Sequence, residues 1–353
     1  MRLASLVLGA GIAVLVVVLG ACGAAPPAPR RAAEPDPIGG ILAGFERSPV
    51  VGLGERHRSA TCHAFLRELI RDPRFAATVN DIVVEFATPF HQDILDRFVV
   101  DGAEVDEREL RTVWQDTTQL LVWDAPMYRE LLATVRDVNR TLPRDRRVRV
   151  LGGDPPIDWS KVHTPADYGP FGARDPDFAR VIERDVLAKH RKALLIIGGI
   201  HLLRRNPLLT TSGRKLQHVT QILAERDPGR IFVVWMLIGP SLGLGPRELR
   251  STTTEVGRRS FAELMPRNLT LLVKGPDGKP VPRAIPDAEI PSIGELMDAL
   301  IYLGPDANEV EAPAEVYRDA TYVAQLRERA AVLREMLGFD MQDVEAEIAR
   351  GQN

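Results

Sequence analysis

The sequence contains little cysteine and little lysine. Its 353 residues include only two cysteines, Cys22 and Cys62, and the first belongs to a leader motif described below. A chain with one remaining cysteine cannot form a disulfide within itself, so its stability has to come from a packed core. Six of the 45 basic residues are lysines, and 48 acidic residues balance the basic ones. The net charge of −3 lacks the cation excess that a nucleic-acid surface needs, so no nucleic-acid partner is expected.

Several familiar catalytic motifs are also missing. The sequence has no Gly-x-x-x-x-Gly-Lys-Ser/Thr phosphate loop, no His-Glu-x-x-His and no Cys-x-x-Cys pair. Gly52-Leu53-Gly54 starts like a dinucleotide loop but is not followed by the third glycine of that pattern. The chemistry of this chain therefore has to come from a less common arrangement of residues.

The longest apolar run lies at the N-terminus. Residues 3–19 are apolar or small, and Leu19-Gly20-Ala21-Cys22 has the cleavage pattern of a bacterial lipoprotein signal. The sequence thus predicts a signal peptide over 1–21, a lipidated Cys22 and a flexible, proline-containing spacer over 22–38. The expected location is the cell envelope, outside the cytoplasm, with acyl chains on Cys22 as the membrane contact. An uncleaved run would be long enough for a minimal spanning helix, which is the alternative.

Residues 39–353 are predicted to form one α/β domain. Apolar, β-branched runs typical of strands occur at 49–53, 81–86, 148–152, 193–198, 230–237 and 269–274. Helical periodicity fills the gaps, at 62–71, 107–121, 126–140, 175–190 and 213–226. Strands that alternate with helices indicate a central, mainly parallel sheet with flanking helices. Residues 87–147 are predicted to be a helical insertion, and 313–353 a helical C-terminal tail broken at Gly338.

Two copies of a Gly-x-x-His motif follow buried-strand patterns. Gly54-Glu55-Arg56-His57 ends the first run, and Gly198-Gly199-Ile200-His201 ends the fourth. Ligands of open α/β sheets bind outside the carboxyl ends of the strands, so the two histidines are expected to converge. Other strand ends add carboxylates to the same edge: Glu55, Glu85, Asp154 and Asp158. Histidine, glutamate and aspartate together suit general acid–base chemistry on water, or a divalent metal with an open coordination position.

The remaining histidines carry weaker signals. His63 falls in the first turns of the next helix, where a surface or capping role is at least as probable as a role in the site. His163 lies in a loop that could line an entrance. Exposed positions are predicted for the others, which lie in polar helical patterns: His91, His190 and His218. Arg184-Asp185 lies in the helix over 175–189, and its periodicity favours an ordinary solvent-facing pair.

The motif order resembles the erythromycin esterase-like, ChaN-like and TIKI/TraB superfamily. The resemblance rests on Gly54-Glu55-x-His57, Val84-Glu85, Arg184-Asp185-x-x-Leu187-Ala188 and Gly198-x-x-His201, and covers about residues 45–240. It implies metal-dependent peptidase activity from the TIKI/TraB branch, ester hydrolysis from the esterase branch, or haem binding by a lipoprotein from the ChaN-like branch. The site residues that the resemblance implies are Glu55, His57, Glu85, Arg184 and His201.

The leading hypothesis from the sequence is an exported, lipid-anchored hydrolase. In it His57 or His201 is the general base on water, Glu55 and Glu85 orient the histidines, and Arg184 stabilises developing negative charge. A divalent metal is the possible cofactor, with His57, His201 and Glu85 as ligands. The alternative is a haem- or metal-binding lipoprotein without turnover, and a third hypothesis is a catalytically inactive binding module. The substrate, a small molecule or peptide, is not specified, because it would depend on 87–147 and 154–175.

Overall fold

The computed structural model describes residues 36–205, 217–264, 270–274, 280–284, 290–337 and 341–352. The predicted signal peptide, Cys22, nearly all of the spacer and Gly338 lie outside these residues. Within the described part of the chain, no helix is both long and apolar enough to cross a membrane.

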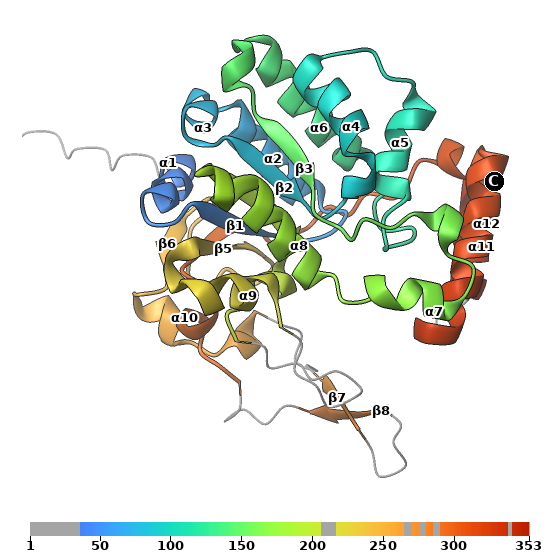
Figure 1. The fold of residues 1–353 in the computed structure, drawn as a ribbon. Helices are drawn as coiled ribbons and strands as arrows, with labels where there is room; N and C mark the ends of the chain where they lie inside the picture. The colour runs from blue at the N-terminus through green and yellow to red at the C-terminus, as the bar shows by residue number, and fades with distance from the viewer. Residues whose placement is uncertain are drawn as a thin grey trace, which may run out of the picture. The chain divides into compact units, whose positions relative to one another are not determined.

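A seven-stranded, mostly parallel sheet forms the centre of the molecule (Figure 1). Its strand order is β3-β2-β4-β1-β5-β9-β6, and all neighbours are parallel except β6, which is antiparallel to β9. The strands are β1 (Val50–Glu55), β2 (Asp81–Val84), β3 (Arg149–Gly152), β4 (Ala193–Gly198), β5 (Ile231–Ile238), β6 (Leu249–Ser251) and β9 (Ala299–Gly304). The predicted α/β class is confirmed, and the first five predicted strands are present.

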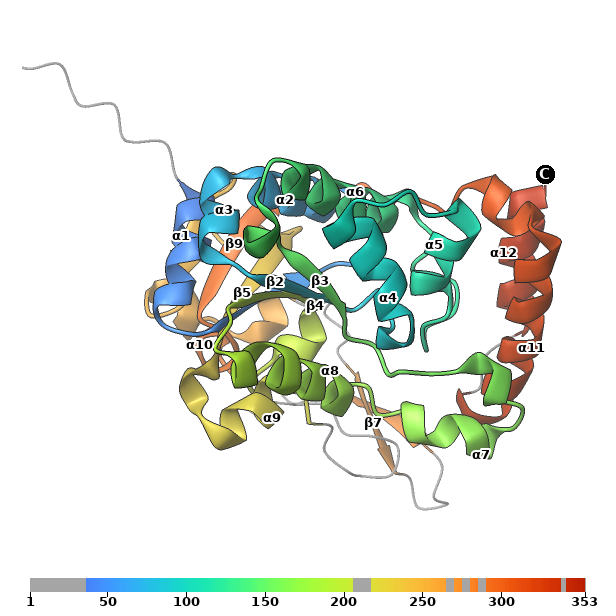
Figure 2. The same ribbon diagram turned by 45° about the horizontal axis from the view of Figure 1, so that its top comes forward.

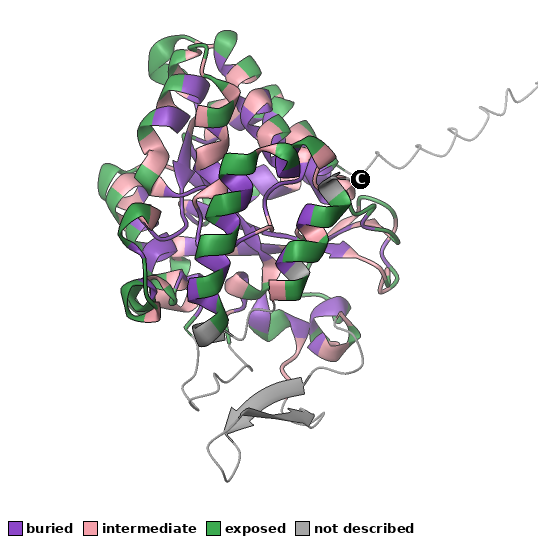
Figure 3. Cartoon of the chain, turned by 90° about the vertical axis from the view of Figure 1, so that its right-hand side faces the viewer, coloured by how far each residue is buried: buried purple, intermediate pink, exposed green. Residues whose placement is uncertain are grey.

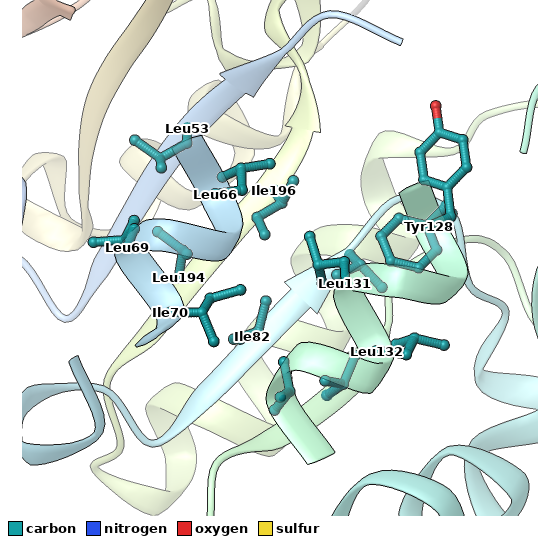
Figure 4. Close-up of a cluster of buried hydrophobic side chains, with 14 of the residues drawn as sticks. Leu53, Leu66, Leu69, Ile70, Ile82, Tyr128, Leu131, Leu132, Leu194 and Ile196 are labelled. Atoms are coloured by element: carbon teal, nitrogen blue, oxygen red, sulfur yellow. The ribbon is translucent and has the colours of Figure 1, made fainter. Parts of the chain in front are cut away.

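Alternation along the strands divides the core into two layers. Leu53, Ile82, Leu194 and Ile196 point to one face of the sheet, where they pack against α2 (Ala60–Arg71) and α6 (Pro126–Arg140) (Figure 4). Neighbouring residues of β2 and β4 point to the opposite face and join a second cluster, which includes Val83, Leu195 and Ile197. Because both faces are covered, the strands are apolar throughout rather than alternating with polar residues.

The helices are divided between the two faces (Figures 1 and 2). The first core cluster draws on α1 (Pro37–Ala43), α2, α3 (Pro73–Thr78), α4 (Gln92–Leu95), α5 (Glu107–Gln115) and α6. The second draws on α8 (Asp175–Val181), which continues in a wider turn over Ile182–Val186, and on α9 (Val219–Arg226) and α10 (Ile293–Leu296). Figure 3 shows buried residues on the sheet and exposed ones on the outer helix surfaces.

The predicted insertion and C-terminal helices are both present. Residues 87–147 connect β2 to β3 and contribute α4, α5 and α6. The C-terminal helices α11 (Ala320–Leu337) and α12 (Met341–Gln352) form a third apolar cluster, and α11 contacts α7 (Pro165–Tyr168) (Figure 2). The two regions are joined at the buried Asp124, which accepts hydrogen bonds from Tyr317 (3.3 Å) and Tyr322 (2.9 Å).

The last predicted strand is present but lies outside the main sheet. The predicted run over 269–274 contains β7 (Thr270–Lys274), which pairs with β8 (Pro280–Ala284) in a separate antiparallel hairpin and not with the main sheet. The sheet is completed instead by β9 and β6, neither of which was predicted. The run Ala299–Gly304 is as long as β1 and β4 and is apolar through Leu303, so a strand-like local pattern is present there. The three-residue β6 is fixed by its pairing with β9.

Candidate active site

The site lies at the carboxyl ends of three adjacent strands. In the order β2-β4-β1, the last residue of β1, Glu55, is paired with Gly198 at the end of β4. Glu85 directly follows β2, and its N–H donates to the Ile196 carbonyl of β4 at 3.1 Å. The chain order therefore brings both Gly-x-x-His motifs and Glu85 to one point, as the sequence predicted.

His57 is held by a carboxylate at one ring nitrogen. Its Nδ1 lies 2.6 Å from an oxygen of Glu55, and the other Glu55 oxygen lies 3.0 Å from Nε2 of His63. Both His63 and Glu55 are buried, whereas the His57 side chain is 38% exposed. The edge of the His57 ring packs on Trp123, with ring centroids 4.6 Å apart. Glu55 therefore fixes the orientation of His57 and is itself fixed by His63.

His201 has the same arrangement on the opposite side. Its Nδ1 lies 2.8 Å from an oxygen of Asp175, and the second Asp175 oxygen accepts a hydrogen bond from the Val219 N–H at 2.7 Å. Since an ionised carboxylate can only accept, each Nδ1 carries the proton and each Nε2 of a neutral ring offers its lone pair. The two histidines are thus a matched pair of imidazole–carboxylate units.

Glu85 lies between these two units. One of its oxygens is 3.9 Å from His57 Nε2, and the other is 3.7 Å from His201 Nε2. The same carboxylate accepts hydrogen bonds from the Gly198 N–H at 2.6 Å and from Arg174 Nη1 at 2.8 Å. Glu85 is almost fully buried, so it is a fixed negative charge that both histidines face.

A buried arginine balances part of this charge. The Arg174 guanidinium bridges Glu85 and Asp154, with Nε 2.8 Å from an Asp154 oxygen. Asp154 also accepts from the N–H (2.6 Å) and the hydroxyl (2.9 Å) of Thr118. An isolated buried carboxylate would be costly, and the shared arginine offsets part of that cost for two of them.

These contacts shift the acidities in a consistent direction. Burial raises the pKa of Glu85, but the charges of Arg174, His201 and His57 outweigh it and hold that pKa at about 2. Burial likewise raises the pKa of Glu55, and its hydrogen bonds to His57 and His63 bring it below the ordinary value. Burial lowers the pKa of His57, whereas Glu55 and Glu85 raise it more, so the net shift is upward. The site therefore stabilises the protonated form of His57.

Glycines allow the two motifs to come close together. A Cβ on Gly198 would lie 3.0 Å from His57 Cε1 and 3.2 Å from a Glu85 oxygen. A Cβ on Gly54 would lie 3.0 Å from the backbone of Gly199. The glycine residues of both motifs are explained by this close approach, because any side chain would separate the residues that face Glu85.

A cavity of about 350 Å³ opens over the site. His57, His201, Gly198 and Gly199 line one side of it. The rest of its lining is mostly apolar and includes Ile200, Trp235, Ile238 and Leu264. Arg56 is the cationic residue at the rim, and it pairs with Glu309 at 2.7 Å. The cavity joins polar, catalytically capable groups to an apolar wall, as binding sites for small molecules commonly do.

Arg184 does not lie with the other predicted residues. Its side chain is 63% exposed and its guanidinium pairs with the neighbouring Asp185. The helix begins at the carboxyl edge of the sheet because it follows β3, and ten residues advance it by about 15 Å toward the opposite edge. Arg174, which directly precedes the helix, occupies the position expected for Arg184. The position of Arg174 just before this helix could have identified it in the sequence, because the first residues of a helix that follows a parallel strand face the strand ends.

Two further histidines are buried. The sequence left both a surface role and a site role open for His63, which is buried against Glu55. His218 is 3% exposed although its sequence pattern indicated a surface position. Burial lowers the pKa of His218 to about 4. Asp175 was not singled out from the sequence at all. By contrast, His163 and Asp158 line a separate cavity of about 800 Å³ between the 157–165 loop and α11.

The predicted metal set of His57, His201 and Glu85 does not fit a metal ion. Glu85 accepts a hydrogen bond from the permanently charged Arg174 at 2.8 Å. A divalent ion on this carboxylate would lie close to that guanidinium. Ligand atoms converge instead at Asp175, His201 and His218 in the described part of the chain.

A serine motif follows β5. Gly239-Pro240-Ser241-Leu242-Gly243 matches the Gly-x-Ser-x-Gly form of a nucleophile elbow. An elbow requires a helix directly after the strand, whereas this segment runs through turns toward the edge strand β6. The Ser241 hydroxyl accepts from the Gly243 N–H at 3.3 Å within its own turn. This serine therefore lacks the setting of a nucleophile.

No family model and no curated protein matches the sequence. Similar solved structures include the erythromycin esterase EreC in its open conformation, at 13% identity and a TM-score of 0.48, covering 77% of this chain and 94% of that one. A succinoglycan biosynthesis protein is 10% identical with a TM-score of 0.49, covering 75% and 91%. ChaN of Campylobacter jejuni, whose structure concerns cofacial haem binding, is 14% identical with a TM-score of 0.37, covering 57% and 86%.

The structural neighbours thus include the esterase and ChaN-like proteins that the motif order resembles. Neither likeness assigns an activity to this chain, whose chemistry depends on its own residues.

Proposed function

We propose that this protein is a hydrolase that activates water to cleave uncharged carboxylic esters. The observation that carries the proposal is the matched pair of histidines: each is fixed at Nδ1 by a carboxylate, and each turns Nε2 toward the same buried Glu85. This is the arrangement that lets an imidazole accept a proton in a defined direction.

His57 is the general base in this proposal. Its Nε2 takes a proton from water as the water oxygen bonds to the ester carbonyl carbon. Glu55 stabilises the imidazolium that forms, which agrees with the upward shift of the His57 pKa. His201, protonated at Nε2 before the step, lies on the other side of Glu85 and gives that proton to the leaving alcohol oxygen. His57 then releases its proton to solvent and His201 takes one up, which restores both rings. The products are one carboxylic acid and one alcohol, and the water supplies all the atoms that are added.

The charge of the site favours an uncharged substrate. One arginine, Arg174, is buried among the carboxylates at this edge of the sheet. The four carboxylates are Glu55, Glu85, Asp154 and Asp175. A phosphate or carboxylate group would be repelled by this excess. The apolar lining by Trp235, Ile238 and Leu264 suits an apolar part of the substrate beside the ester. Hydrolysis of p-nitrophenyl butyrate, with no release from p-nitrophenyl phosphate, is the result that supports the proposal.

Glu55→Gln should move the acidic limb of the ester-hydrolysis profile to lower pH. The base form of His57 is needed, so the wild-type rate should rise as pH passes through a His57 pKa above the ordinary value of about 6.5. Without the Glu55 charge that pKa falls. Initial rates from pH 5 to 9 with p-nitrophenyl butyrate measure the shift. Glu309→Gln, which alters an exposed carboxylate, is the control, and an unmoved limb in Glu55→Gln would assign the titration to another group.

Gly198→Ala should reduce turnover by about 100-fold or more while the protein stays folded. The backbone at Gly198 has φ −49° and ψ 131°, which alanine adopts without strain, so the damage comes from the Cβ that pushes on His57 and Glu85. Gly169→Ala is the matched control, because no atom lies within 4 Å of a Cβ there. Equal turnover in both variants would show that a Cβ at position 198 does not disturb His57 or Glu85.

Addition of haem should produce no shift of the Soret band. Both Nδ1 atoms are held by carboxylates, and each Nε2 atom lies within 3.9 Å of a Glu85 oxygen. A water molecule can approach Nε2 there, whereas a porphyrin ring needs a wide, flat clearance around its axial nitrogen. A Soret shift that disappears in His57→Ala would favour the haem-binding alternative over the hydrolase.

We propose in addition that acylated Cys22 anchors the protein in the cell envelope. The support is the cleavage pattern Leu19-Gly20-Ala21-Cys22.

A further inference from the structure

His218 is a buried histidine without a role in the proposed reaction. It precedes α9, is 3% exposed, and neither of its ring nitrogens has a hydrogen-bond partner among the residues that the structure describes. A ring at this position could cap α9 by accepting a hydrogen bond from the Gln221 N–H. That N–H donates instead to the His218 carbonyl at 2.9 Å. Buried polar groups are nearly always partnered, so this ring calls for a ligand.

Two site residues lie within reach of His218. One ligand atom from each of Asp175, His201 and His218 lies within 4.8 Å of the other two. The rings of His201 and His218 meet edge to face, with centroids 6.2 Å apart. Three separate segments supply these groups: the start of α8, the turn after β4, and the start of α9. Figure 1 shows α8 and α9 side by side on one face of the sheet.

The donor set is typical of a transition-metal site. Two imidazoles and one carboxylate, with further positions open, bind Zn²⁺ or Fe²⁺ in proteins. The surroundings favour a cation, because Glu85 lies 3.7 Å from His201 and the four carboxylates of this edge exceed the charge of Arg174. A bound ion would give His218 the partner that it lacks.

We propose that Asp175, His201 and His218 form a binding site for one divalent transition-metal ion. The ion would tie α8 and α9 to the turn after β4. This inference does not rest on the hydrolase proposal, although both use His201 and Asp175. A bound ion would occupy a ring nitrogen of His201 that the reaction needs, so ester hydrolysis belongs to the metal-free protein and Zn²⁺ should inhibit it.

Zinc binding to the full chain tests the site. Untagged protein is stripped with a chelator, freed of it, and titrated with ZnCl₂ in a calorimeter, and Co²⁺ absorption reports the ligand field. The wild type should bind one ion. His218→Phe and Asp175→Asn should each bind about 100-fold more weakly or not at all, since each lacks one of three ligands. Circular dichroism of the stripped variants shows whether both are folded.

Two control variants locate the ion. His57→Phe keeps all three proposed ligands, and His163→Phe removes a histidine in the other cavity, so both should bind Zn²⁺ like the wild type. Unchanged affinity in His218→Phe and Asp175→Asn, or a loss in His57→Phe equal to theirs, would overturn the site. Ester hydrolysis by stripped wild type is measured separately. If the protein binds Zn²⁺ but does not hydrolyse the ester, the hydrolase proposal alone fails. If it hydrolyses the ester but does not bind Zn²⁺, the metal-site proposal alone fails.

Discussion

His57→Ala and His201→Ala are each expected to slow ester hydrolysis by about 10²–10⁴-fold, the range for loss of a general acid or base. Both imidazoles face Glu85 and serve one catalytic cycle, His57 as the base and His201 as the acid, so removing either one blocks the same turnover. The double variant should then be little slower than the slower single one. Turnover of p-nitrophenyl butyrate by the three variants, compared with wild type at pH 7.5, measures this.

The control for the histidine pair is His163→Ala. His163 lines the separate cavity and should be dispensable for turnover. Fully additive losses in His57→Ala and His201→Ala would show two independent steps. Wild-type rates of hydrolysis in both single variants would show that the two histidines are not catalytic and would favour a binding module.

Arg174→Met is expected to lower the free energy of unfolding by about 3–5 kcal/mol at pH 7, the usual cost of breaking a buried ion pair from one side. The substitution leaves Glu85 and Asp154 buried without their cation. Urea denaturation followed by circular dichroism measures the loss. Adding Asp154→Asn should restore part of it, because one of the two unpaired charges is then gone.

Arg184→Met is the matched control for Arg174→Met. Its guanidinium is exposed and pairs with Asp185, so its loss should change the unfolding free energy by about 0.5 kcal/mol or less. Equal losses in the two variants would contradict the role given to Arg174.

The effect of Arg174 should also depend on pH. The Glu85 pKa of about 2 lies below its unfolded value of about 4.3, so its contribution to stability is present above pH 4.3 and is lost as pH falls toward 2. The arginine maintains this low pKa. The difference in unfolding free energy between wild type and Arg174→Met should therefore become smaller as pH falls below about 4.3.

Local sequence patterns were sufficient for the parts of the fold with strong periodicity. Five strands and the helices α2 and α6 were predicted close to their observed bounds, because apolar runs and helical spacing are local properties. The helix predicted over 175–190 consists of α8 and the wider and tighter turns that continue it to Lys189. The strand β7 was predicted, but its pairing with β8 outside the main sheet was not. The strand β9 was missed although its apolar run is as long as β1 and β4. The three-residue β6 was missed because so short a segment becomes a strand through its neighbour, which no local pattern records.

The candidate site divides in the same way. The sequence by itself determined Glu55, His57, Glu85 and His201, because each follows a buried strand and parallel strands end at one edge. Only the tertiary structure decided which partners hold them. Arg174, Asp175, His63 and His218 come from helix starts whose orientation depends on packing across the sheet. Arg184 matched a family motif, yet about three helical turns carry it away from the edge where Arg174 lies.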